Sequence, residues 1–234
     1  MARLIAALLR HGAYHQLPDT PSALQPFPLT DSGAEQAERS VTLIQGTLKM
    51  FNWSLHPVID SSRLLRGWQT AEVMRQGLQL GRDEALSIQS FDALAERSLG
   101  SAANLTLKQI ESVLHEDPRF SAPPAGWKSD SKYRLPLQGA ESLMEAGERV
   151  ARHLEQRLVA LQSEAEVDSV KLFVGHGAAF RHAAYHLGLL AYDQIAALSM
   201  YHCRPVFIER LPEGSWRHLT GEWKIRAEGD EFVD

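Results

Sequence analysis

The chain has 234 residues, of which 44% are hydrophobic and 23% charged, and its formal net charge is −5. This length is enough for one α/β domain with a sizeable core. The negative balance disfavours nucleic acid and anionic membranes as partners, so an anion site must be a local basic pocket. Cys203 is the only cysteine, which excludes an intrachain disulfide framework. No apolar run is long enough to span a bilayer, and we expect a cytoplasmic protein.

The first part of the chain alternates predicted strands and helices. Residues 4–9 form a continuous apolar run, typical of a strand buried on both faces. A loop rich in proline and glutamine covers residues 14–28, and Thr30 then caps a helix whose apolar residues repeat at helical spacing as far as Leu48. Next come a short strand over 57–60, a helix over 68–80 and a strand over 86–91.

An irregular, proline-containing stretch covers residues 104–139. It is too polar and too short to build a core of its own, so we expect a lid-like insertion within a single domain that spans residues 1–234.

The second part of the chain continues the alternation. The pattern predicts an α/β fold with three layers, in which helices flank a mostly parallel central sheet. The predicted elements are an amphipathic helix over 141–162, a strand over 170–174, a helix over 178–190, a strand over 204–210 and a hairpin edge over 216–225.

Two histidines stand directly after predicted strands, and each is flanked by glycine. Arg10-His11-Gly12 follows the first strand, and Gly175-His176-Gly177 follows the strand over 170–174. Open α/β sheets present their chemistry at strand ends, and a glycine lets a ligand approach the backbone closely. We therefore predict that His11 and His176 form one phosphate site, with Gly12 against the substrate.

Further motifs occur between these two histidines, and their order resembles that of the histidine phosphatase superfamily, branch 1, whose fold is phosphoglycerate mutase-like. The resemblance covers most of the chain. It implies that His11 is the nucleophile, that Arg10, Arg66 and His176 bind the phosphate, and that Glu96 is the acid and base. The matching segments are Leu9-Arg10-His11-Gly12, residues 28–37 with Gly33 and Gln36, residues 62–71 around Arg66, Glu96 with Gly100, Gly139-Ala140-Glu141-Ser142, and Val174-Gly175-His176-Gly177.

Phosphoryl transfer explains why these residue types are needed. Its loose transition state spreads charge over three equatorial oxygens, so catalysis depends on positioning and electrostatic stabilisation. Arg10 and Arg66 supply planar forks that match those oxygens, and His176 adds a third donor. Neutral His11 would attack phosphorus to form a phosphohistidine, with its other ring nitrogen held by an acceptor such as a backbone carbonyl. Glu96 would protonate the leaving alkoxide and then activate water.

Other sites are less specific in the sequence. We predict that His15 and Arg134 contact the substrate, and a solvated loop position is the alternative for each. His182 and His186 have the spacing of a zinc pair, but Ala183 stands where a zincin carries glutamate. We therefore predict no metal and no cofactor.

We expect a hydrolase, a histidine-type acid phosphatase that acts on a small phosphorylated metabolite and releases inorganic phosphate. The residues after Gly12 are Ala13-Tyr14-His15-Gln16, which depart from the pattern of phosphoglycerate mutases and favour hydrolysis. The same residues also resemble a mitochondrial branch that acts on phosphoproteins. Mutase-type phosphoryl transfer, a phosphoprotein substrate, an inactive binding protein and a homodimer all stay open.

Overall fold

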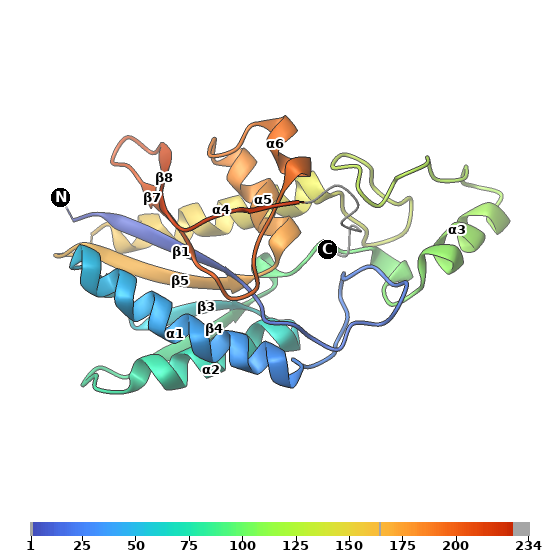
Figure 1. Cartoon of the computed structure of the whole chain (residues 1–234). Helices are drawn as coiled ribbons and strands as arrows, with labels where there is room; N and C mark the ends of the chain where they lie inside the picture. The colour runs from blue at the N-terminus through green and yellow to red at the C-terminus, as the bar shows by residue number, and fades with distance from the viewer. Residues whose placement is uncertain (1, 164, 227–234) are drawn as a thin grey trace.

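The computed structural model describes residues 2–163 and 165–226, and it contains a central sheet covered by helices on both faces (Figure 1). The strands of this sheet are β1 Leu4–Arg10, β2 Ser54–Leu55, β3 Val58–Ser62, β4 Ser87–Phe91, β5 Ser169–Gly175, β7 Val206–Arg210 and β8 Trp216–Thr220. The α-helices are α1 Asp31–Phe51, α2 Leu65–Gln79, α3 Leu107–Glu116, α4 Leu143–Leu161, α5 Gly177–His186 and α6 Tyr192–Ala197.

The sheet is mostly parallel, as the alternation of strands and helices predicts. In the described part of the chain its strand order is β4-β3-β5-β1-β7-β8, with β2 paired to β5. Strands β4, β3, β5 and β1 are parallel neighbours, whereas β7 and β8 are antiparallel. The short strands β6 Leu198–Ser199 and β9 Lys224–Ile225 pair separately. The predicted α/β class and three-layer architecture are confirmed.

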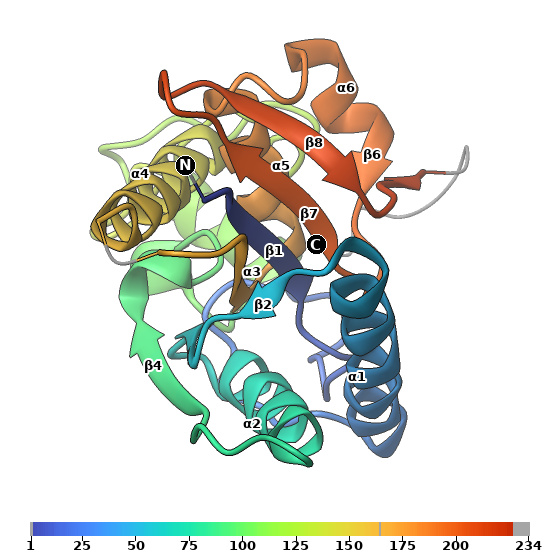
Figure 2. The same ribbon diagram turned by 90° about the vertical axis from the view of Figure 1, so that its left-hand side faces the viewer.

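Strand β1 is apolar on both faces because both faces are covered. Ile5, Ala7 and Leu9 point to the core beneath α1 and α2, and the alternate residues point to the core beneath α4 and α5. Figure 2 shows these two helical layers on opposite sides of the sheet. The continuous apolar run over residues 4–9 is therefore the signature of a central strand rather than of an edge strand.

The register of two central strands positions the functional residues. Arg10 at the end of β1 lies beside Gly175 at the end of β5. The next residue of each strand is therefore a histidine at the same edge of the sheet. The N–H of His11 donates to the carbonyl of Gly175 over 3.0 Å, which fixes the chain where it leaves the strand.

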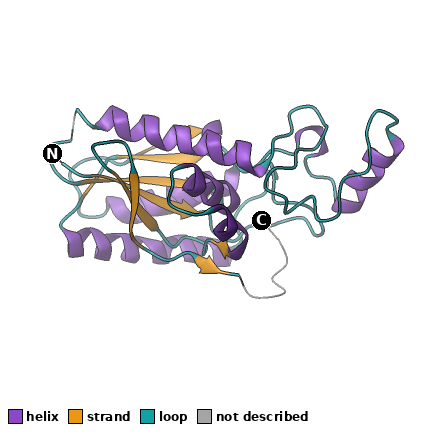
Figure 3. Ribbon diagram, turned by 90° about the horizontal axis from the view of Figure 1, so that it is seen from above, coloured by secondary structure: helices purple, strands orange, loops and turns teal. Residues whose placement is uncertain are grey.

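The insertion is more ordered than its composition indicates. Helix α3 begins with a capping box between Thr106 and Gln109. The insertion also has a hydrophobic cluster in which Ile110, Leu114 and Trp127 are buried together with Ala23 of the proline-rich loop. The cluster also contains Leu99, Ala102 and Ala140 from outside residues 104–139, so the insertion shares this core with the segments beside it. Figure 3 shows the insertion projecting from the end of the sheet.

Candidate active site

His11 and His176 lie side by side at the carboxyl ends of β1 and β5. Their ring centroids are 5.0 Å apart, and the side chains are 2% and 1% exposed. His11 Nδ1 donates to the carbonyl of Gly12 over 2.7 Å, the backbone acceptor that the sequence argument requires. With the proton on Nδ1, the lone pair of His11 is on Nε2.

Arg66 connects the two histidines. Its Nε–H donates to His11 Nε2 over 3.2 Å, and its Nη2 lies 3.3 Å from His176 Nδ1. Since a guanidinium can only donate, both of these ring nitrogens are acceptors. The structure thus brings Arg66 and the two predicted catalytic histidines into direct contact.

The other nitrogen of His176 points away from this contact. His176 Nε2 donates to Ser62 Oγ over 2.9 Å, so neutral His176 presents a lone pair, not an N–H, to Arg66. The sequence argument makes His176 a third donor to phosphate. In this arrangement that role requires a second proton on Nδ1.

Burial controls the protonation of both rings. Burial holds the pKa of His11 well below its usual value, and the neighbouring His176, Arg66 and Arg10 lower it further. The pKa of His176 is lowered well below the usual value by burial and then by Arg66 and Arg10. Both rings are therefore neutral at neutral pH, and a neutral imidazole is the form that can act as a nucleophile.

The glycines of the two motifs accommodate neighbouring protein atoms. A Cβ on Gly12 would lie 2.3 Å from the carbonyl oxygen of Gly33 in α1, and one on Gly177 would lie 3.1 Å from Cδ of Arg10. Gly12 is therefore needed for the close approach of α1. Its predicted contact with substrate stays a prediction.

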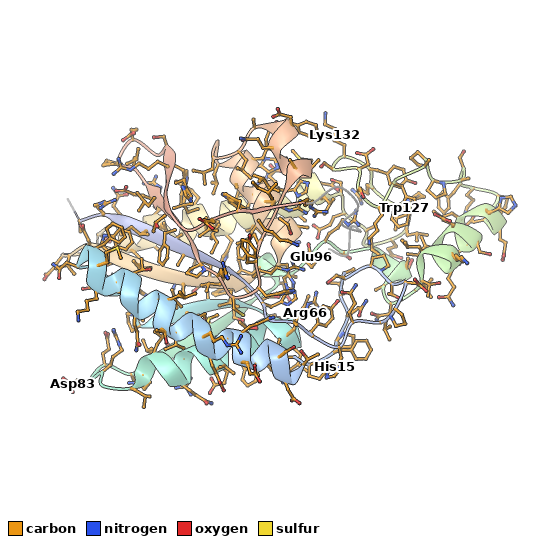
Figure 4. All side chains as sticks on the ribbon, viewed as in Figure 1. His15, Arg66, Asp83, Glu96, Trp127 and Lys132 are labelled. Atoms are coloured by element: carbon orange, nitrogen blue, oxygen red, sulfur yellow. The ribbon has the colours of Figure 1, made fainter. Side chains whose placement is uncertain are left out.

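Arg10 and Glu96 complete the cluster. Arg10 leaves β1 and donates to the carbonyl of Met200 over 3.1 Å. Glu96 is 5% exposed and accepts the N–H of Arg97 over 2.9 Å. Burial lowers the pKa of Arg66, and the nearby Tyr14 and Glu96 oppose that shift. Figure 4 shows Glu96 and Arg66 in the same region, where the body of the protein meets the insertion.

Side chains of the matching motifs hold the backbone of the nucleophile segment. The N–H of Gly12 donates to Thr70 Oγ1 over 3.1 Å, and the N–H of Ala13 donates to Gln36 Oε1 over 2.9 Å. Thr30 caps α1 as predicted, since its hydroxyl accepts the N–H of Gly33.

Two predicted substrate residues lie outside this cluster. The side chain of His15 is exposed on the proline-rich loop (Figure 4). Arg134 is exposed in the insertion and pairs with Glu145 at the start of α4 over 3.2 Å. Both are exposed, whereas His11 and His176 are buried, and the roles of His15 and Arg134 stay predictions.

His202 lies beside His11 and was not predicted from the sequence. Its Nδ1 donates to the carbonyl of His11, and the two ring centroids are 5.6 Å apart. His202 follows the short strand β6 and lies beside Arg10 in an isolated bridge. It carries no glycine-flanked motif, so only the fold, which places His202 in a bridge beside Arg10, reveals it.

The chain resembles a known protein family in its sequence. Residues 6–220 match the model of the histidine phosphatase superfamily (branch 1). The chain belongs to this superfamily. The same membership supports a phosphatase or mutase enzyme. No curated protein matches the chain.

Solved structures share the fold. A mycobacterial glucosyl-3-phosphoglycerate phosphatase is 20% identical, with 97% of this chain and 99% of that chain covered and a TM-score of 0.66. A protein described as mycobacterial hydrolase 1 is 21% identical, with coverage of 97% and 99% and a TM-score of 0.68. Phosphoglycerate mutase from Bacillus anthracis str. Sterne is 16% identical, with coverage of 95% and 92% and a TM-score of 0.69. At these identities the likeness establishes the phosphoglycerate mutase-like fold.

The structure also bears on the zinc pair suggested by the spacing of His182 and His186. His182 Nδ1 contacts the carbonyl of Ala178, and its Nε2 contacts Ser131 Oγ, so both nitrogens are engaged in packing. Among the described residues, no three histidine, cysteine or acidic side chains gather as a metal site would require. No helix in the described ranges has the length and apolar character needed to cross a membrane.

Proposed function

We propose that the protein is a metal-independent phosphomonoesterase that works through a phosphohistidine on His11. The observation that carries the proposal is the pair of contacts on the His11 ring. The Nδ1–H donates a hydrogen bond to the Gly12 carbonyl, and the lone pair on Nε2 accepts from Arg66. A nucleophilic nitrogen beside a phosphate-binding cation suits in-line attack on a phosphoryl group.

In the first half-reaction, the lone pair of His11 Nε2 forms the bond to phosphorus as the P–O ester bond breaks. Protonated Glu96 gives its proton to the leaving alkoxide. Arg10 and Arg66 stabilise the charge on the equatorial oxygens. The bound dianion favours uptake of a proton from solvent on Nδ1 of His176, which then donates as well and returns that proton to solvent when phosphate leaves.

In the second half-reaction, Glu96 acts as a base. Its carboxylate takes a proton from water, the water oxygen attacks phosphorus, and the P–N bond breaks. The lone pair returns to His11 Nε2, inorganic phosphate leaves, and Glu96 is again protonated. Each residue thus ends the cycle as it began, without any further reactant.

The burial of the cluster supports a small substrate. His11, Arg66 and His176 are each at most 2% exposed, beneath the proline-rich loop and beside the insertion. A small phosphorylated metabolite fits such an enclosed place better than a folded phosphoprotein. The glucosyl-3-phosphoglycerate phosphatase neighbour acts, by its name, on a small phosphate ester, which supports the same class.

Phosphate release from a panel of metabolite phosphates tests this proposal. The enzyme is expected to release inorganic phosphate from at least one small ester, and His11→Ala is expected to abolish release. Phosphoglycerate mutase-type transfer is the alternative, since a mutase has the same fold. Isomerisation of a phosphoglycerate faster than its hydrolysis would favour the mutase and contradict the hydrolase.

A further inference from the structure

Tyr14, three residues after His11, lies against both functional side chains of the cluster. Its ring meets the His11 ring edge-on, with centroids 5.4 Å apart and an interplanar angle of 86°. The guanidinium carbon of Arg66 lies over the face of the same ring, 4.5 Å from its centroid. A cation over an aromatic face in a desolvated place is attracted by the ring quadrupole.

The hydroxyl of Tyr14 closes a second connection to the same arginine. Tyr14 Oη and Ser22 Oγ are 2.8 Å apart. The carbonyl of Ser22 in turn accepts from Arg66 Nη2 over 2.8 Å. Tyr14, Ser22 and Arg66 therefore form a closed triangle of three contacts: a ring stacked on a cation, a pair of hydroxyls and a backbone carbonyl.

We call residues 14–28 the strap, because this loop covers the buried cluster. Besides Ser22, the strap carbonyls of Ala23 and Gln25 accept from Arg66 over 2.9 and 2.8 Å. The Arg66 side chain thus makes four contacts with the strap, to these three carbonyls and to the Tyr14 ring. The same side chain also contacts His11 and His176.

The strap has its own supports, so it can serve as a frame. The Gln25 side chain is fully buried, accepts the N–H of Leu17 over 2.9 Å and donates to the carbonyl of Pro21 over 2.9 Å. Ala23 packs in the hydrophobic cluster of the insertion, and the carbonyl of Asp19 accepts the N–H of Leu107 over 3.0 Å. The insertion thereby holds the strap from the outer side.

We propose that Tyr14 is a positioning residue for the phosphate clamp: its ring seats the Arg66 guanidinium, and its hydroxyl ties the strap to that seat through Ser22. This inference rests on the proposed function, in which Arg66 holds the transferring phosphoryl group. When the His11 lone pair bonds to phosphorus, the Nε–H of Arg66 loses its acceptor and must turn to a phosphoryl oxygen. A flat aromatic face lets the planar guanidinium make this turn while its distance from the ring is kept.

Paired substitutions separate the ring from the hydroxyl. Tyr14→Leu removes the ring, Tyr14→Phe removes only the hydroxyl, and Ser22→Ala removes the other hydroxyl of the pair. Tyr192→Phe is the matched control, because Tyr192 is 45% exposed on α6 and its ring contacts Tyr185 and Lys132. Initial rates on the best ester from the metabolite panel give kcat and KM. The inhibition constant of inorganic phosphate measures how tightly the enzyme binds phosphate in the ground state.

Tyr14→Leu is expected to lower kcat/KM about 30-fold, mainly in kcat, as for loss of a desolvated cation–π contact. Tyr14→Phe is expected to recover most of this loss and to stay about fivefold below the wild type, as for one lost hydrogen bond. The double variant Tyr14→Phe/Ser22→Ala is expected to be no worse than the poorer single variant, because both remove the same contact. Tyr192→Phe is expected to match the wild type.

Two outcomes overturn the inference. One is a Tyr14→Leu enzyme whose kcat and KM stay within about twofold of the wild type. The other is a Tyr14→Phe/Ser22→Ala enzyme whose losses multiply, since the two hydroxyls would then act separately. If Tyr14→Leu does not fold, as judged by denaturant unfolding, the comparison of Tyr14→Phe, Ser22→Ala and the double variant tests the inference by itself. If Arg66→Ala is also fully active, the proposed clamp itself fails, which is distinct from a failure of Tyr14 alone.

Discussion

The Nε–H of Arg66 donates to Nε2 of His11 over 3.2 Å, so the proposed phosphate-binding arginine and the proposed nucleophile are in direct contact. This contact fixes the orientation of the His11 ring and leaves the lone pair on Nε2. It also favours the neutral ring, because a cation beside Nε2 disfavours its protonation. In the proposed mechanism, a substrate phosphoryl group displaces this contact and then interacts with both Arg66 and His11.

Removal of the Arg66 fork is expected to lower turnover by about two to three orders of magnitude. Loss of one donor aimed at transition-state charge costs roughly 3–4 kcal/mol, by analogy with oxyanion donors. Arg66→Lys is expected to restore only part of the activity, because an ammonium cannot reach His11, the strap carbonyls and the phosphoryl group together. Steady-state kinetics of Arg66→Ala and Arg66→Lys measure both effects.

The same substitution also tests the structure. The carbonyls of Ser22, Ala23 and Gln25 lose their shared donor in Arg66→Ala, so denaturant unfolding must be measured alongside activity. Arg39→Ala is a suitable control, since Arg39 is an exposed residue of α1 whose pair with Glu35 contributes little. Full activity in a folded Arg66→Ala protein would place Arg66 outside the chemistry.

The Glu96→Gln substitution is expected to depend on the leaving group. The amide keeps the shape of the carboxyl group but cannot protonate an alkoxide. Cleavage of an alkyl phosphate is expected to slow strongly, whereas nitrophenyl phosphate, whose leaving group needs little protonation, is expected to slow far less. Pre-steady-state rates of phosphoenzyme formation with both esters measure the difference, and Glu148→Gln on the outer face of α4 is the control.

Equal losses with the two esters would leave two explanations, and the amount of phosphoenzyme separates them. Accumulated phosphoenzyme keeps Glu96 as the base that activates water. Its absence points to another carboxylate. Glu141 is the next carboxylate in the motifs, but it is held by Arg149 over 2.6 Å and by the N–H of Ser98 over 3.0 Å. Those contacts fit a support for the Glu96 segment better than an acid.

His182 is expected to make stability depend on pH. Burial lowers its pKa to about 4 in the folded chain, whereas an unfolded chain titrates near 6.5. The folded-state pKa is depressed, so this contribution to stability is complete above about pH 6.5 and is lost as the pH falls toward 4. At pH 5 the loss is about 2 kcal/mol, from about 1.4 kcal/mol per pH unit.

Denaturant unfolding at pH 7 and pH 5 measures this effect. The wild type is expected to lose about 2 kcal/mol more than His182→Gln between the two values, because the amide does not titrate. Equal losses in the two proteins would show that His182 takes up its proton in the folded state.

The sequence predicted the frame of the site for a physical reason. Strands β1 and β5 are central and apolar, and each ends at a polar motif, so a parallel register brings His11 and His176 to one edge. The helix starts are also local features: Thr30 and Ser142 each cap the helix that follows. Features set by neighbouring residues or by one buried strand can be inferred without the fold.

Features that depend on distant parts of the chain were not inferred. A side chain at position 12 would collide with the carbonyl of Gly33, which is distant in sequence. His202 reaches the site only because the chain returns beside Arg10. Helix α3 was missed because prolines dominate the flanking sequence, although its capping box is a local signal. Arg66 donates to three strap carbonyls, and these hydrogen bonds could not be predicted because every residue type has a backbone carbonyl.

The central claim is that His11 becomes covalently phosphorylated during turnover. The most direct measurement is a rapid quench with a substrate that carries labelled phosphate, followed by peptide mapping of the wild type and His11→Ala. The account predicts a label on His11 that survives alkali, is discharged by acid and is absent from His11→Ala. An acid-stable label on serine, or turnover in His11→Ala at the wild-type rate, would contradict it.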